Sequence, residues 1–204
     1  MAKVKLTKKE ADRIMNIEDT TRGTVLITLR DYILNKKGKK GVEMVENRLK
    51  ELGYSFRFKD FTASFKWYQG SFGDLIIPVI LEVFHWDESK AFEIGYDSLI
   101  INSLITKLLM SRLISLETAF KNTPKFWHYF TEVGDMKFTE YDLDKRHAIL
   151  RLDNYKKFHP TEYDYIRGNL AKILEMVTNS KNVQVEQTKS LFNNDSYDEF
   201  KITW

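Results

Sequence analysis

Residues 134–153 read GDMKFTEYDLDKRHAILRLD, and their pattern decides the fold class. Apolar and polar side chains alternate on both sides of a polar turn at residues 143–146. A period of two places every second side chain on the same face of a strand, so this stretch predicts a β-hairpin with one buried face. We expect the buried face to carry Met136, Phe138, Ala148, Leu150 and Leu152.

The residues after the hairpin predict one helix and two further strands. Pro160 opens a stretch with apolar residues at helical spacing as far as Val177. Val183 begins a third strand, and a fourth alternating strand runs to Trp204. The order β-β-α-β-β is typical of an α+β architecture, in which a four-stranded antiparallel sheet carries a helix across one face.

The residues before the hairpin predict a helical part. Its apolar or amphipathic segments fall at residues 23–34, 42–52, 74–84, 91–94, 98–120 and 124–130. The longest expected helix, 98–120, is apolar on more than one side, which indicates burial. We expect Gly95 to end the helix before it. Residues 54–70 predict an aromatic-rich connector without regular structure.

These patterns predict a single domain over residues 1–204. Thr7 and Glu10 have the spacing of a capping box, so we expect a short helix within an N-terminal extension over residues 1–21. The helical part then covers residues 22–133, and the β-β-α-β-β part covers residues 134–204.

The composition is that of a globular protein. Hydrophobic residues make up 43% of the chain, and 32 basic against 29 acidic residues give a formal net charge of +3. The absence of cysteine excludes disulfides, thiolate metal sites and a cysteine nucleophile. The most apolar stretch contains Lys107 and Arg112, which predicts a buried helix rather than a membrane span. With no signal peptide pattern, we expect a cytoplasmic protein.

The sequence contains no motif of a known catalytic or metal site. No two histidines stand four residues apart, and there is no phosphate-binding loop or nucleophile elbow. His85 stands beside Asp87 and Glu88, but at a turn, where a partly exposed histidine is the better interpretation. The lysines of residues 36–40 are interpreted as a solvated helix end rather than a nucleic-acid site. We therefore expect neither an enzyme nor a nucleic-acid-binding protein.

Four segments together resemble a known superfamily of ligand-binding domains. They are residues 22–41, residues 65–95 with Phe65-Lys-Trp-Tyr68, the stretch leading into Pro124-Lys-Phe-Trp-His-Tyr-Phe130, and residues 160–204. The superfamily joins heme–nitric-oxide-binding sensor domains, vinyl-reductase-like small-molecule-binding domains and Golgi transport-particle subunits. The resemblance implies N-terminal helices, a four-stranded antiparallel sheet with a helix, and a buried apolar pocket for heme, a lipid or another hydrocarbon-like ligand.

The chain departs from that superfamily at the ligand-binding residues. Heme members carry an axial histidine on the long central helix and a Tyr-x-Ser-x-Arg motif, whereas residues 98–120 contain no histidine and the motif is absent. Transport-particle members can hold an acyl chain on a cysteine, and this chain has none. We therefore expect no cofactor and no heme bound in the manner of the family, but an apolar molecule or lipid held without a covalent bond.

The resemblance and the apolar helices together predict a non-catalytic sensor module that binds a small hydrophobic molecule and signals to an unidentified partner. The predicted pocket wall is formed by Leu109, Leu113, Leu116, Phe126 and Tyr129. The alternative for each of these residues is that it fills the core. The alternative for the chain is a ligand-free interaction module that forms a homodimer through an exposed apolar helix face.

Overall fold

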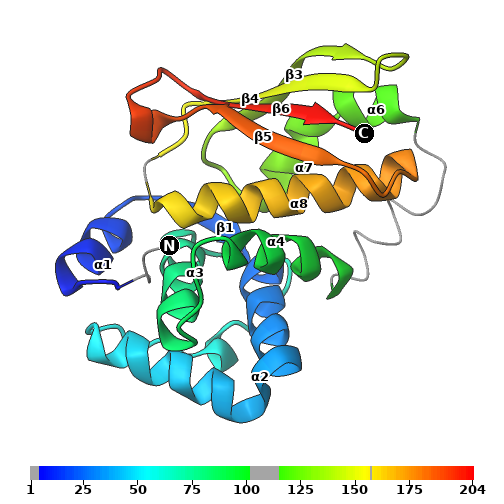
Figure 1. Ribbon diagram of the computed structural model, residues 1–204. Helices are drawn as coiled ribbons and strands as arrows, with labels where there is room; N and C mark the ends of the chain where they lie inside the picture. Colours follow the sequence, from blue (N-terminus) through cyan, green and yellow to red (C-terminus); the bar gives the residue numbers. More distant parts are fainter. Residues whose placement is uncertain (1–4, 102–114, 157) are drawn as a thin grey trace.

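The computed structural model describes residues 5–101, 115–156 and 158–204, and it confirms the α+β fold class. Figure 1 shows a layered arrangement, with the sheet on one side, α8 beneath it, and α3, α4 and α2 below α8. The helices are α1 (Lys8–Met15), α2 (Gly23–Glu51), α3 (Ser71–Val83), α4 (Lys90–Ile101), α6 (Leu116–Lys121), α7 (Thr123–Phe130) and α8 (Pro160–Thr178). The strands are β1 (Thr20–Arg22), β2 (Trp67–Gln69), β3 (Asp135–Asp142), β4 (His147–Asp153), β5 (Gln184–Lys189) and β6 (Asp198–Thr203).

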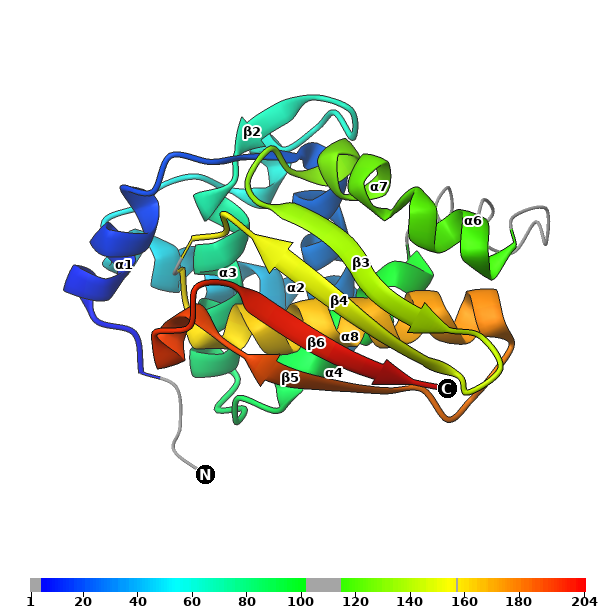
Figure 2. The same ribbon diagram turned by 90° about the horizontal axis from the view of Figure 1, so that it is seen from above.

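The larger sheet has four antiparallel strands in the order β3-β4-β6-β5. The predicted hairpin forms with Met136 opposite Leu152 and Phe138 opposite Leu150, and a bulge follows Phe138. The last strand pairs with the hairpin, so that Phe200 lies opposite Leu150. Figure 2 shows α8 running beneath this sheet, as predicted.

The buried face of the sheet forms one of two hydrophobic cores, which we call the sheet core. It consists of Phe120, Met136, Ala148, Leu150, Leu152, Tyr163, Ile166, Leu170, Ala171, Leu174, Val185, Phe200 and Ile202. The residues come from α6, from the strands and from the face of α8 that meets them. Strand alternation produces this core directly, because the intervening residues of β4 are only partly buried.

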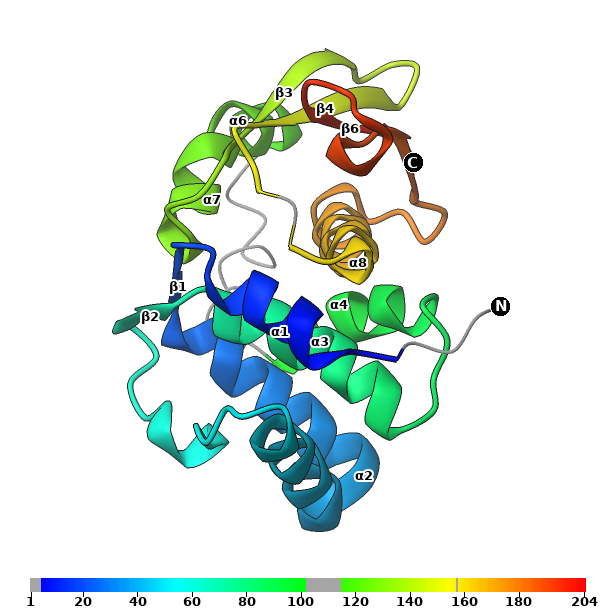
Figure 3. The same cartoon turned by 90° about the vertical axis from the view of Figure 1, so that its left-hand side faces the viewer.

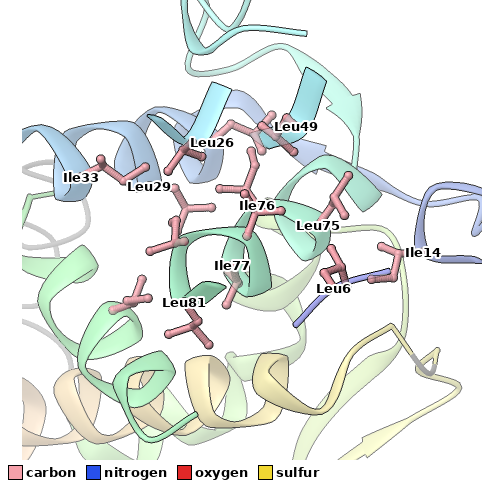
Figure 4. Packing of buried hydrophobic residues seen from close by; sticks show 14 of the residues in the cluster. Leu6, Ile14, Leu26, Leu29, Ile33, Leu49, Leu75, Ile76, Ile77 and Leu81 are labelled. Carbon is pink, nitrogen blue, oxygen red and sulfur yellow. The ribbon is translucent and has the colours of Figure 1, made fainter. Parts of the chain in front are cut away.

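The second hydrophobic core, which we call the helical core, is organised around α3. All residues of α3 from Gly73 to Leu81 are buried, and Pro78 lies inside the helix. Figure 4 shows side chains of α3 meeting those of α2. The largest fully buried side chains of the helical core include Ile14, Leu26, Leu29, Tyr32, Ile33, Leu49, Leu75, Ile76, Ile80, Leu81 and Phe158.

The two helices predicted at residues 23–34 and 42–52 are the two arms of α2. They meet at Gly38, where φ is 65° and ψ is −170°. A residue with a Cβ atom is strained at such dihedral angles, so glycine allows the kink. Both arms contribute buried residues to the helical core, among them Leu29 and Val45.

The prediction that Gly95 ends a helix is wrong. The helix α4 continues through Gly95 to Ile101. A Cβ atom on Gly95 would lie 2.0 Å from the carbonyl oxygen of Tyr165, and a Cβ atom on Gly168 would lie 2.0 Å from that of Phe92. The two glycines therefore serve the close crossing of α4 and α8, which Figure 3 shows with α8 seen along its axis.

Two further predictions about local structure are wrong. Residues 54–70 include regular structure, because β2 pairs with β1 in a two-stranded sheet with Tyr68 opposite Thr21. The predicted helix over residues 98–120 is not continuous, since Ser115 has an extended backbone and caps a new helix, α6, by accepting from the amide of Thr118. Residues 102–114 of that prediction lie outside the described residues.

Within the described part of the chain, no helix has the length and apolar character needed to cross a membrane. The short helix α1 has the predicted capping box of Thr7 and Glu10. It packs on the helical core through Ala11 and Ile14. The segment boundaries proposed at residues 21 and 133 remain predictions.

Candidate functional site

The structure places three of the five predicted wall residues. Leu116 begins α6 and is partly buried against the sheet core. Phe126 and Tyr129 lie on α7 with 39% and 38% of their surface exposed. Leu109 and Leu113 lie outside the described residues. The wall as a set therefore stays a prediction.

An aromatic cluster fills the space where α6 meets the sheet. The ring of Phe120 stacks on that of Phe138 with 3.9 Å between the centroids. The rings of Tyr141 and Trp204 meet Phe120 edge-on at 5.3 and 5.9 Å. Edge-to-face and offset pairs of this kind stabilise a packed cluster beyond the area that they bury. The cluster fixes the position of α6 and of the Trp204 side chain.

A cleft of about 510 Å³ opens beside this aromatic cluster. It lies between the start of α6, the C-terminal end of α8 and the β3–β4 turn, and it is lined by Leu116, Arg146, Val177, Thr178, Asn179, Ser180 and Trp204. The volume falls within the range of about 300–1,000 Å³ that is usual for ligand pockets. We take this cleft as the candidate ligand site.

The cleft is lined mainly by polar groups, from Arg146, Thr178, Asn179 and Ser180, and has a smaller apolar part. Leu116, Val177 and Trp204 supply the apolar surface. Arg146 lies in the β3–β4 turn with φ at 51°, and its carbonyl oxygen accepts from the amide of Trp204 at 3.2 Å. Among the described residues, no carboxylate forms an ion pair with Arg146. The cleft therefore suits an acidic group at Arg146, with a small apolar contact beside it.

The sequence reasoning missed Arg146 and Trp204 as site residues. Each was assigned to an element of the sheet, Arg146 to a turn and Trp204 to a strand. The backbone hydrogen bond between them forms only when β4 and β6 pair, and the cleft needs the end of α8 as well. No local pattern in the sequence carries that information.

A second cleft of about 460 Å³ lies at the other end of the β3–β4 hairpin. Its charged residues are largely neutralised by one another, because Asp153 accepts from Lys137 at 3.1 Å and also pairs with Arg151. Asp135 pairs with His128 at 3.3 Å. With its charges satisfied internally, this cleft is a weaker candidate than the one at Arg146.

None of the four histidines lines the candidate cleft, although His147 directly follows Arg146. His85 is exposed after α3, His128 and His147 contact Asp135 and Glu140, and His159 caps α8. Burial lowers the pKa of His159 to about 4, so its ring is neutral at pH 7. In the described residues there is no group of three or more histidine or acidic side chains able to hold a metal ion.

Comparison with known proteins identifies the fold. No family model matches the chain, and no curated protein does. Among solved structures, the H-NOX protein from S. oneidensis in the Fe(II)NO ligation state has a TM-score of 0.61 at 13% identity, over 89% of this chain and 97% of that one. An oxygen-binding H-NOX domain related to soluble guanylate cyclases has a TM-score of 0.57 at 14% identity, over 88% and 89%.

A third similar structure belongs to a protein in which porphyrin distortion modulates the heme redox potential. Its TM-score is 0.60 at 12% identity, over 90% of this chain and 99% of that one. Identities this low show the fold alone. This chain therefore has the fold of heme–nitric-oxide-binding domains, as the sequence resemblance implied.

These neighbours correct the expectation of no cofactor and no heme. Two of the three similar structures are named for heme or an Fe(II)NO state and the third for an oxygen complex, so the expectation that rests on the absence of heme is contradicted. The expectation relied on the missing histidine in residues 98–120 and on the absent Tyr-x-Ser-x-Arg motif. Most of the stretch 98–120, namely residues 102–114, lies outside the described residues. A missing histidine in this stretch does not exclude an iron ligand elsewhere in the chain.

Proposed function

We propose that this chain is a ligand-binding sensor domain. The observation that carries the proposal is the shared fold, which covers about nine-tenths of this chain and nearly all of each H-NOX neighbour. The neighbours are named for binding heme, nitric oxide or oxygen. A sensor needs a ligand pocket and no catalytic group, and the described residues offer the cleft at Arg146.

We place the ligand with its acidic group at Arg146 and its apolar part against Trp204, Leu116 and Val177. A heme has a flat apolar body and two propionates; Arg146 suits a propionate and the small apolar part of the cleft suits the ring edge, whereas the mostly polar lining does not match the face of the ring. The described contacts of the cleft include no histidine. The proposal therefore assigns this chain's residues to holding the propionates and the ring edge, and derives no step at the iron.

A heme titration tests the proposal. Purified protein is mixed with hemin, and the Soret absorption band is followed as the concentration rises. We expect saturable binding at one site, weakened about fivefold in Arg146→Ala, because an exposed ion pair contributes up to about 1 kcal/mol. Arg30→Ala is the matched control, since Arg30 pairs with Asp31 on α2, away from the cleft. Binding that does not saturate, or an equal effect of both variants, contradicts the proposal.

A fatty acid titration, followed by quenching of tryptophan fluorescence, separates heme from other acidic apolar ligands. Trp204 lines the cleft, so a ligand seated there changes its emission. If both ligands bind and compete, the site is general for acidic apolar molecules. If neither binds, the sensor proposal loses its site.

A second candidate function is self-association through the face formed by β1, β2 and α7. The Arg22 guanidinium lies 3.9 Å from the ring centroid of Trp67 and 5.5 Å from that of Tyr129. It also donates to the carbonyl oxygen of Tyr129 at 3.1 Å. Phe65 is 63% exposed and Phe126 is 39% exposed beside this arrangement. Exposed aromatic side chains around a fixed arginine are typical of protein interfaces.

Sedimentation velocity tests self-association. If this face forms a homodimer, Phe65→Ser shifts the chain toward the monomer, whereas Leu143→Ser at the exposed β3–β4 turn leaves the dimer unchanged. A wild-type chain that stays monomeric at tens of micromolar removes this candidate.

A further inference from the structure

Two acidic side chains meet where the helical core joins α8. Asp74 lies in the first turn of α3, and Glu162 lies in the first turn of α8. Asp74 is 9% exposed and Glu162 is 6% exposed. The helix α3 packs against α8, and the two carboxyl groups are hydrogen-bond partners of each other. The Tyr155 hydroxyl donates to Oε1 of Glu162.

The pair has no cation to balance it. Among the described residues, neither Asp74 nor Glu162 forms an ion pair with lysine, arginine or histidine, and Oδ2 of Asp74 accepts no hydrogen bond. Two ionised carboxylates have only acceptor atoms, so they cannot bond to each other. One proton between them resolves both problems, because the protonated carboxyl group becomes the donor and the pair carries one charge instead of two.

The surroundings favour the retention of that proton. Asp19 lies beside Gly70, the residue before α3, and Asp198 lies on β6. The negative charges of both oppose ionisation of the pair. Tyr155, Tyr163 and Tyr165 are the other titratable groups that face it. The N-termini of α3 and α8 favour one negative charge on the pair, which the shared state provides.

We propose that Asp74 and Glu162 share one proton, and that this proton holds α3 against α8. The contact between the helical core and α8 then depends on pH. Loss of the proton leaves two negative charges in contact in a site that excludes water. The charges then repel, and the separation of α3 from α8 relieves the repulsion. The pair thus forms a proton-sensitive joint inside the fold, independent of the ligand cleft.

The direction of the pH effect follows from linkage. Burial raises the pKa of Glu162 to about 7, and burial together with Glu162 raises the pKa of Asp74 well above its usual range. The folded chain therefore binds more protons than the unfolded chain at neutral pH. The stability of the folded chain must therefore fall as the pH rises. For one extra bound proton, the equilibrium constant of unfolding increases by up to about tenfold per pH unit.

The window from pH 7 to 9 isolates this effect from neighbouring groups. The pKa of Asp19 is raised to about 6 by burial, so Asp19 is ionised throughout the window. His159 has a pKa lowered to about 4 by burial, and it is neutral there in both the folded and the unfolded chain.

The test is the urea unfolding of wild type, Asp74→Asn and Asp144→Asn at several values of pH from 7 to 9. Asparagine has the shape of the carboxyl group, does not titrate and can donate to Glu162. We expect the wild type to lose stability across the window, Asp74→Asn to lose at most a third as much, and the exposed control Asp144→Asn to follow the wild type. Equal pH slopes in all three proteins overturn the proposal.

A spectroscopic measurement keeps the proposal testable if Asp74→Asn does not fold. Infrared difference spectra of the folded wild type in heavy water at pH 7.5 and 9 report the carbonyl stretch of protonated carboxyl groups. We expect this band at the lower pH, and its absence in Glu162→Gln, in which Gln donates to Asp74. No such band in the wild type at the lower pH means that no proton is shared, and the proposal fails.

Discussion

The helical core and the sheet core differ in what encloses them. The helical core surrounds α3, in which every residue from Gly73 to Leu81 is buried. The sheet core is closed by the sheet and α8, but at α6 it adjoins a cleft of about 510 Å³. The buried α3 gives the helical core rigidity, whereas a core that borders a cleft can exchange contacts with a ligand. We therefore propose that the helical core supports the fold and that the sheet core borders the binding site.

The largest expected difference between the cores comes from deleting one side chain in each. Ile76→Ala removes a side chain with no exposed surface from α3, and we expect it to lower the free energy of unfolding by about 4 kcal/mol. Leu116 borders the cleft, where water can enter the space that Leu116→Ala leaves. We therefore expect this variant to lower the free energy of unfolding by only about 1 kcal/mol. Urea unfolding at pH 7 measures both. Similar losses in the two variants would show that the cleft is closed in solution.

The second prediction concerns the crossing of α4 and α8, which joins the two cores. Gly168→Ala places a Cβ atom against the carbonyl oxygen of Phe92, and backbone cannot move aside as a side chain can. We expect a loss of about 3 kcal/mol, although alanine is the better helix former. Gly73→Ala is the control, since its Cβ atom would lie 3.7 Å from Leu26.

Thermal unfolding of the two glycine variants decides whether the crossing is as close as described. The control should retain or slightly raise the melting temperature, because alanine favours the helix and meets ordinary contact distances. A melting temperature of Gly168→Ala equal to that of the wild type would mean that α4 and α8 lie further apart.

The sequence predicted the sheet core better than the joint between the cores. The alternating pattern in residues 134–153 indicates which side chains are buried, so it predicts both the hairpin and its inward-facing residues. The three-residue strands β1 and β2 are too short to show a period, and they were missed. Glycine is typical of a helix end, so the sequence predicts one at Gly95, whereas the role of Gly95 depends on the Tyr165 carbonyl group in a distant helix.

The candidate site was the least predictable part of the molecule. Two of the predicted wall residues, Phe126 and Tyr129, lie on a helix in which no residue is buried. Their apolar character is equally suited to an exposed face. Arg146 and Trp204 come together only through strand pairing, and Asp74 meets Glu162 only because α3 and α8 start near each other. Such contacts between distant elements leave no periodic signal in one sequence.

The third prediction uses His159, which caps α8 beside the helical core. Burial lowers its pKa to about 4, so between pH 4 and 6.5 the unfolded chain binds the extra proton. This contribution to stability is therefore complete above pH 6.5 and is lost as the pH falls to 4, by about 2 kcal/mol. His159→Asn retains a capping side chain and should remove that loss, whereas His147→Asn on β4 should not.

Urea midpoints measured from pH 4 to 6.5 check the histidine prediction. The acidic pair at Asp74 and Glu162 acts in the opposite direction over part of this range, so the comparison is between variants and not between values of pH. If His159→Asn retains the full pH slope of the wild type, the histidine is hydrated and the N-terminus of α8 is more open than described.

The smallest expected effect tests how α6 is attached beside the cleft. Ser115 accepts from the amide of Thr118 at 3.1 Å and so caps α6. Ser115→Ala removes that acceptor, and we expect a loss of about 1 kcal/mol. Thr7→Ala at the capping box of α1 is the matched control and should lose a similar amount, because it also leaves one helix amide without its acceptor.

The two capping variants should differ in ligand binding rather than in stability. Since α6 carries Leu116 into the cleft, fraying of its first turn displaces a lining residue, whereas α1 contributes none. Hemin titration of both variants should therefore show weaker binding in Ser115→Ala alone. Equal affinities would separate α6 from the site and leave recognition to Arg146, Trp204 and the end of α8.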